Sequence, residues 1–185
     1  MIFVTSDFHF GHNKDFVYAK RGFSSVEEMN EYLVDTANLF VGPDDDFYIL
    51  GDLMLGGDEN FEYVKKLNGK LHLVYGNHDT DRRIALYKTL PNLVEDGFAL
   101  RLNYKKYHFY LSHFPTLTGN IDKETLHQMT LNLYGHTHQE TFIYDELHPY
   151  MFHVGVDSAP SFQPWDLDQI ILIMKQLYRK TSLVE

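Results

Sequence analysis

Short apolar runs alternate with helix-like patterns over the first half of the chain. Residues 2–6, 47–50 and 71–75 are apolar runs that predict strands, and each gives way abruptly to polar residues. Apolar residues at helical spacing predict helices over 26–40, 58–68 and 81–90. This alternation of strand and helix is typical of α/β proteins with parallel strands.

The second half has a different pattern. Apolar and polar residues alternate over 98–102 and 107–111, which predicts two strands joined by a turn at 103–106. Further strand candidates are 131–134, 141–144 and 151–156, and Asp166 is expected to cap a final helix. No repeat or linker divides the chain. We therefore expect a mixed α/β fold and a single domain over residues 1–185.

Charge and composition exclude several classes of function. The chain has 16 Lys and Arg against 26 Asp and Glu, a net charge of −10, and no cysteine. Such a chain has no overall attraction for polyanions, so we expect neither a long nucleic acid nor a membrane as a stable partner. Cysteine-based metal sites and thiol catalysis are excluded. The N-terminal apolar run turns polar too soon for a signal peptide, which favours a cytoplasmic location.

Five of the predicted strands end at side chains that can bind metals. In open α/β sheets, sites form at the carboxyl ends of strands. Residues two apart in an extended segment point to one face, so Asp7 with His9, and His136 with His138, are each expected to bind metal from one side. The seven candidate ligands, too many for one tetrahedral site, are Asp7, His9, Asp52, Asn77, His113, His136 and His138.

Seven ligands suit two metal ions that share a bridging carboxylate. Mixed imidazole and carboxylate ligation suits Mn, Fe, Zn, Ni or Co, with manganese as the leading candidate, and argues against Mg or Ca alone. Two ions about 3.5–4 Å apart can stabilise both the attacking and the leaving oxygen of an in-line displacement.

The five motifs also carry a family resemblance. Asp-x-His, Gly-Asp, Gly-Asn-His-Asp, a single His and Gly-His-x-His, in this order, resemble the calcineurin-like metallophosphoesterase superfamily over roughly three quarters of the chain. The opening motif at residues 6–12 is similar to that of short prokaryotic and phage-type members. The resemblance implies two stacked mixed β-sheets flanked by helices.

The same resemblance implies a role for each residue. Asp7, His9 and His138 would hold the first metal, Asn77, His113 and His136 the second, and Asp52 would bridge them. A bridging hydroxide would attack phosphorus in line. His78 would stabilise the transition state or protonate the leaving oxygen, and Asp79 would orient His78.

The resemblance favours hydrolysis of small phosphate esters, with phosphodiesters or nucleotides preferred because the site should be open. His12 and Arg21 are candidate substrate contacts, although His12 could equally hold a loop and exposed arginines are mostly solvated. Asp157 is interpreted as a cap or turn residue and His153 as structural. The choice between monoester and diester, and the oligomeric state, stay open.

Two features bear on the alternatives. Gly51-Asp52 continues into Leu53 rather than the Asp-Arg-Gly of protein phosphatases, which argues against phosphoprotein substrates. The alternative function is a non-catalytic, protein-binding scaffold on the same fold, but such scaffolds typically lose the histidine that follows the motif asparagine. Here His78 is present.

Overall fold

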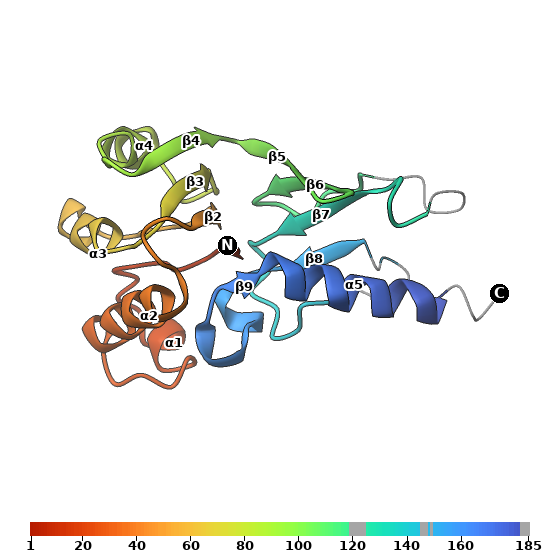
Figure 1. Cartoon of the computed structure of the whole chain (residues 1–185). Helices are drawn as coiled ribbons and strands as arrows, with labels where there is room; N and C mark the ends of the chain where they lie inside the picture. Colours follow the sequence, from red (N-terminus) through yellow and green to blue (C-terminus); the bar gives the residue numbers. More distant parts are fainter. Residues whose placement is uncertain (119–124, 145–147, 149, 182–185) are drawn as a thin grey trace.

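Two β-sheets lie side by side in the computed structural model, which describes residues 1–118, 125–144, 148 and 150–181 (Figure 1). The first sheet has the order β4-β3-β2-β1-β9 and the second β5-β6-β7-β8. The first comprises β1 (Ile2–Thr5), β2 (Asp46–Leu50), β3 (Lys70–Val74), β4 (Leu93–Gly97) and β9 (Trp165–Asp166). The second comprises β5 (Ala99–Tyr104), β6 (Tyr107–Ser112), β7 (Thr130–Tyr134) and β8 (Met151–His153).

Both sheets are mixed. In the first, β1 to β4 are parallel and β9 is antiparallel to β1, whereas in the second β5 is antiparallel to β6 and the other pairs are parallel. Helices flank the sheets (Figure 1). The helices are α1 (Asp15–Tyr18), α2 (Val26–Phe40), α3 (Phe61–Lys65), α4 (Asp81–Tyr87) and α5 (Leu167–Thr181), with 3-10 turns η1 (Asp58–Asn60), η2 (Val156–Ser158) and η3 (Pro160–Phe162). The predicted fold of two mixed sheets flanked by helices is confirmed.

Successive residues of the first sheet face two different cores. In β2, Phe47 and Ile49 pack against α2, α3 and α4, while Tyr48 and Leu50 belong to the core shared with β6, β7 and α5. Because side chains alternate across a strand, both faces of this sheet are buried, which explains why its strands are nearly continuous apolar runs.

Several elements differ from the sequence-based expectation. The helix predicted over 58–68 is split into η1 and the short α3. The strand predicted at 141–144 is absent, since only Ile143 forms an isolated bridge with Phe152. Conversely, β4, β9 and α1 were not predicted; β9 has two residues and α1 four, lengths at which periodicity carries no signal. No helix within the described ranges is long and apolar enough to cross a bilayer.

The topology brings strand ends from both sheets to one place. The carboxyl ends of β1, β2 and β3 meet in the first sheet, and those of β6, β7 and β8 meet in the second. A parallel bridge between Ser6 and Gly155 joins the segment after β1 to the segment after β8. The two groups of loops therefore meet where the sheets are joined.

Candidate metal centre

The backbone at these strand ends is strained. Eight of the described non-glycine residues have φ between 48° and 68°. Three of them lie elsewhere (Lys105, Ser161 and Phe162), and the five at these strand ends are Asp7, His9, Asp52, His136 and His138. Each conformation of this kind costs on the order of 1–3 kcal/mol and persists only when the surrounding structure enforces it. All five had been singled out as metal ligands, so the strain coincides with the candidate site.

Glycines before the ligands allow the loops to approach one another closely. Gly51 has a φ of 93°, and a Cβ built on it would lie 2.5 Å from Nδ1 of His113. A Cβ on Gly76 would lie 2.2 Å from Oδ1 of Asp52. These glycines permit close backbone approach, since any side chain there would displace a candidate ligand.

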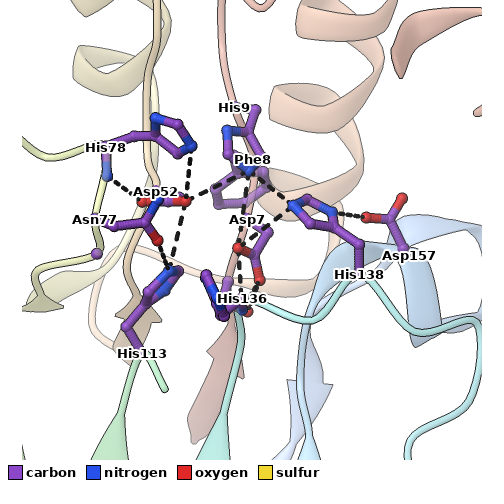
Figure 2. A network of polar contacts seen from close by, with 12 residues as sticks. Asp7, Phe8, His9, Asp52, Asn77, His78, His113, His136, His138 and Asp157 are labelled. Atoms are coloured by element: carbon purple, nitrogen blue, oxygen red, sulfur yellow. Dashed lines mark hydrogen bonds and ion pairs between the residues drawn. The ribbon is translucent and has the colours of Figure 1, made fainter. Parts of the chain in front are cut away.

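Asp7, His9 and His138 form the first group of potential ligands, with all three ligand atoms within 4.8 Å of one another. Nε2 of His9 lies 3.1 Å from Nε2 of His138 and 3.8 Å from Oδ1 of Asp7 (Figure 2). Nδ1 of His138 lies 2.7 Å from Oδ2 of Asp157, which fixes the proton on Nδ1 and leaves Nε2 as an acceptor. Lone pairs from both sheets therefore converge on one point.

Asp7, Asp52 and His113 form the second group, and Asn77 adjoins it. Nδ1 of His113 donates to the carbonyl oxygen of Leu50 at 2.9 Å. Its Nε2 lies 2.9 Å from Oδ1 of Asn77 and 3.5 Å from Oδ2 of Asp52. In the neutral ring Nε2 is an acceptor, so three acceptors face one another here.

Acceptors that face acceptors repel unless a cation or a shared proton lies between them. Both groups consist of imidazole nitrogens and carboxylate oxygens, a donor set that suits a divalent transition metal. In each group a histidine is oriented through its other ring nitrogen, by Asp157 or by the Leu50 carbonyl, as metal-binding histidines usually are. The residues present therefore fit metal ions, and the buried Asp and His groups could hold them.

Burial sets the electrostatics of the ligands. Burial raises the pKa of Asp7, because its carboxylate is completely removed from water. Burial also acts to raise the pKa of Asp52, but a hydrogen bond and the charge of His113 outweigh it and bring the pKa to about 2. Burial lowers the pKa of His9 to about 2, so its ring is neutral and available as a ligand. A cation would stabilise this buried pair of carboxylates.

Three other predicted residues lie around the groups. The ring of His136 packs 5.0 Å from that of His113, centre to centre, and its backbone N–H donates to Asp7, but its ring nitrogens belong to neither group. His78 is half exposed, with Nε2 3.9 Å from Oδ2 of Asp52. His12 packs 5.5 Å from the ring of His9.

The contacts of the Asp79 carboxylate differ from the predicted one with His78. Its carboxylate accepts four hydrogen bonds, from the backbone N–H groups of Asp52, Leu53 and Gly76 and from the hydroxyl of Tyr87. Within the described residues no hydrogen bond joins it to the ring of His78. Because the carboxylate points into the turn beneath the site, Asp79 holds the Asp52 and Gly76 loops together.

Arg21, a candidate substrate contact, is buried and makes internal contacts. Its side chain is 3% exposed, and it donates to Asp157 and to backbone carbonyls of the loop after β1. Asp157 was missed as a functional candidate, yet it contacts both Arg21 and His138. One signal could have revealed it: Asp157 lies shortly after Gly155 and after the end of β8, and the other candidates also lie just after the ends of their strands.

The chain has relatives among known proteins. No family model matches the sequence. The chain is 30% identical over 183 residues to an uncharacterized protein of Methanocaldococcus jannaschii, and the match covers 95% of this chain and 92% of that protein. It is 26% identical over 179 residues to the gene 66 protein of Mycobacterium phage L5, with 83% and 85% covered.

Solved structures with the same fold include two bacterial proteins. A protein of unknown function from Aquifex aeolicus superposes with a TM-score of 0.68 at 20% identity, covering 94% of this chain and 98% of that one. The phosphoesterase Yfce from E. coli superposes with a TM-score of 0.50 at 20% identity, covering 84% and 78%. At these identities the likeness establishes the fold, which is the metallophosphoesterase-like sandwich.

Proposed function

This chain belongs to the family of the uncharacterized M. jannaschii protein, and we propose that it is a phosphoesterase that depends on two divalent metal ions. The observation that carries the proposal is the convergence of metal-competent atoms from both sheets in two adjacent groups that share Asp7. The fold shared with a phosphoesterase supports it.

Asp52 is the proposed bridging ligand. Its Oδ2 atom lies 3.7 Å from Nε2 of His9 and 3.5 Å from Nε2 of His113, so it is within reach of a histidine of each group, which supports a bridging role. Its Oδ1 atom accepts a hydrogen bond of 2.9 Å from the backbone N–H of His78, which fixes the carboxylate's orientation. The proposed ligands are Asp7, His9 and His138 for the first ion and Asn77, His113 and His136 for the second.

Bound divalent ions, with manganese as the leading candidate and Fe, Zn, Ni or Co as alternatives, would supply positive charge for the phosphate oxygens and activate the attacking water. The chain's own groups must then orient the ester and handle the leaving oxygen. His78 is suited to the second task. Its backbone is held by Asp52 and by Arg83, which donates to its carbonyl, while its ring is half exposed. The ring can therefore reach a leaving oxygen and protonate it.

The proposed substrates are small phosphate esters, with phosphodiesters or nucleotides preferred. Three groups of the site face solvent: the side chains of His78 and His138 are 45% and 41% exposed, and Phe114 is half exposed. The ring of Phe114 lies 4.6 Å from that of His136, centre to centre. An open site with an aromatic ring beside the ligands suits an ester that carries a planar group.

Two substitutions test the proposal. Asp52→Asn removes the proposed bridging charge, so it should lower both the bound metal and the hydrolysis of an aryl phosphodiester. His78→Ala should leave the metal content near that of the wild type and lower kcat by about 100-fold to 10,000-fold, because it removes a proton donor and no metal ligand. Metal analysis and initial rates with Mn²⁺, Ni²⁺ or Zn²⁺ measure the two effects.

Matched controls are Asp168→Asn and His127→Ala, which change exposed residues outside the site. Both should retain wild-type metal content and rate. Full activity after Asp52→Asn or His78→Ala would contradict the mechanism. A wild-type chain that hydrolyses no phosphomonoester, phosphodiester or cyclic dinucleotide with Mn²⁺ present would instead favour the scaffold function.

A further inference from the structure

Arg21 is a buried cation whose donors are all engaged. Its Nε and Nη2 atoms donate to the two carboxylate oxygens of Asp157 at 2.8 and 2.9 Å. Nη2 also donates to the carbonyl oxygen of Asp7 at 2.9 Å, and Nη1 donates to that of Phe8 at 3.1 Å and contacts Sδ of Met29 at 3.6 Å. These contacts account for the five N–H groups of the guanidinium.

Asp157 connects this cation to a ligand on the other sheet. Its Oδ2 atom accepts from Nη2 of Arg21 and from Nδ1 of His138, the latter at 2.7 Å (Figure 2). His138 lies in the loop after β7, whereas Asp7 lies in the loop after β1. A continuous series of hydrogen bonds therefore runs from the backbone beside one ligand of the first group to the ring of another.

We infer that Arg21 and Asp157 are positioning residues that assemble the first metal group before an ion binds. Asp157 keeps the proton of His138 on Nδ1 and so directs the Nε2 lone pair towards Asp7 and His9. Arg21 fixes Asp157 and, through two carbonyls, the loop that carries Asp7 and His9. The inference rests on the metal site of the proposed function but concerns residues that touch neither substrate nor metal.

A purely stabilising role explains these contacts less well. Taking a guanidinium and a carboxylate out of water costs free energy, and their mutual attraction often does no more than offset this cost. A buried ion pair is therefore weak evidence for stability. The pair does fix the relative positions of its partners, because the planar guanidinium of arginine can bind a carboxylate and two carbonyl oxygens at the same time. Groups that orient metal-binding histidines typically change metal affinity by about 10-fold to 100-fold when removed.

Asp157→Asn is the principal test. The asparagine amide has one acceptor oxygen, so its NH₂ group must face either Nε of Arg21 or the Nη2 and Nδ1 donors of Arg21 and His138. In either orientation the two-oxygen contact with the guanidinium is lost, and His138 is held less firmly. We expect titration of the chelator-treated protein with Mn²⁺ to show one site weakened by about 10-fold to 100-fold and the other unchanged. Asp168→Asn, which alters an exposed carboxylate paired with Lys105, should leave both affinities unchanged.

Arg21→Lys tests the other end of the series. An ammonium keeps the charge but cannot hold a carboxylate and two carbonyls together, so the same site should weaken, by less than in Asp157→Asn. If Asp157→Asn does not fold, judged by circular dichroism of the metal-free protein, Arg21→Lys carries the test alone. Wild-type affinity at both sites in a folded variant, even one with a lower melting temperature, would overturn the inference.

A second readout needs no metal. Long-range ¹H–¹⁵N spectra of the metal-free protein at alkaline pH report which ring nitrogen of His138 carries the proton. We expect the proton on Nδ1 in the wild type and a mixture of tautomers in Asp157→Asn. A mixture already present in the wild type would overturn the inference, whereas an ordered His138 in a protein without hydrolytic activity would contradict only the proposed function.

Discussion

Nε2 of His113 lies 2.9 Å from the amide oxygen of Asn77, although the only proton of the neutral ring is on Nδ1, where it is donated to the Leu50 carbonyl. Two acceptors at this distance need a positive charge between them. Either a proton or a metal ion can supply that charge, and the adjacent Asp52 carboxylate, 3.5 Å from Nε2, favours both.

Replacing His113 tests whether the two groups bind separate metal ions. In His113→Ala we expect bound metal to fall from two equivalents to one, because the second group loses the ring nitrogen that faces Asn77 and Asp52, while no residue of the first group is changed. Metal analysis after dialysis measures the stoichiometry. His108→Ala removes an exposed histidine of β6, the strand that His113 follows, and should bind two equivalents. Two equivalents in His113→Ala would show that this ring is not a ligand.

Replacing Asp79 should affect stability more than chemistry. In Asp79→Asn the NH₂ group would face N–H donors that the carboxylate accepts from in the wild type. We therefore expect the free energy of unfolding to fall by about 2 kcal/mol or more. Tyr87→Phe removes one of the four donors and should cost about 1 kcal/mol, whereas Tyr32→Phe, at an exposed position, should cost nothing measurable. Chemical denaturation provides the comparison. An Asp79→Asn protein of wild-type stability that no longer hydrolyses esters would mean that Asp79 acts on His78.

Phe114 should determine preference among esters. Phe114→Ala is expected to raise KM for an aryl or nucleoside phosphodiester by about fivefold to tenfold, since stacking on an aromatic ring is worth about 1 kcal/mol or more. The KM of a small alkyl ester should hardly change. Phe98→Ala, which removes another exposed ring, is the control. Equal effects on aryl and alkyl esters would refute a stacking role.

His153 should make stability depend on pH. It is fully buried, neither ring nitrogen has a hydrogen-bond partner among the described residues, and burial lowers its pKa from 6.5 to about 4. Between these pH values the unfolded chain binds a proton that the folded protein does not. The free energy of unfolding should therefore decrease as the pH falls from 6.5 to 4, by up to about 3 kcal/mol from this residue.

His153→Leu isolates that contribution. The variant should lose part of the decrease, while the remainder reflects other groups such as His9, whose pKa burial also lowers. Denaturation curves at several pH values, recorded with a chelator present, give the two profiles. His108→Leu should keep the wild-type profile, and an unchanged profile in His153→Leu would refute the assignment.

Long, regular elements and the order of motifs could be predicted from the sequence. The strand ends at Asp7, Asp52 and His113 were placed correctly because apolar runs stop abruptly at polar residues there. Parallel pairing then brings such ends together without further information. Short elements such as β9 were missed, since two residues show no periodicity.

Contacts between loops could not be predicted in this way. Arg21 and Asp157 are 136 residues apart, and neither position shows a pattern that indicates burial. Their pairing depends on how the segment after β8 joins the segment after β1, which is a property of the packed sheets. The direction of the Asp79 carboxylate, towards backbone N–H groups and away from His78, is likewise decided by a turn geometry that the sequence does not display.

The strained conformations at Asp7, His9, Asp52, His136 and His138 also bear on how such a centre is lost in evolution. Glycine at any of these positions would relieve strain and would also remove a candidate ligand. A mutation that makes the fold more stable would therefore damage the site. A descendant released from selection for catalysis should therefore accumulate glycine or asparagine at these five positions while keeping its two sheets. In this chain all five positions carry side chains that can bind metal, three histidines and two aspartates.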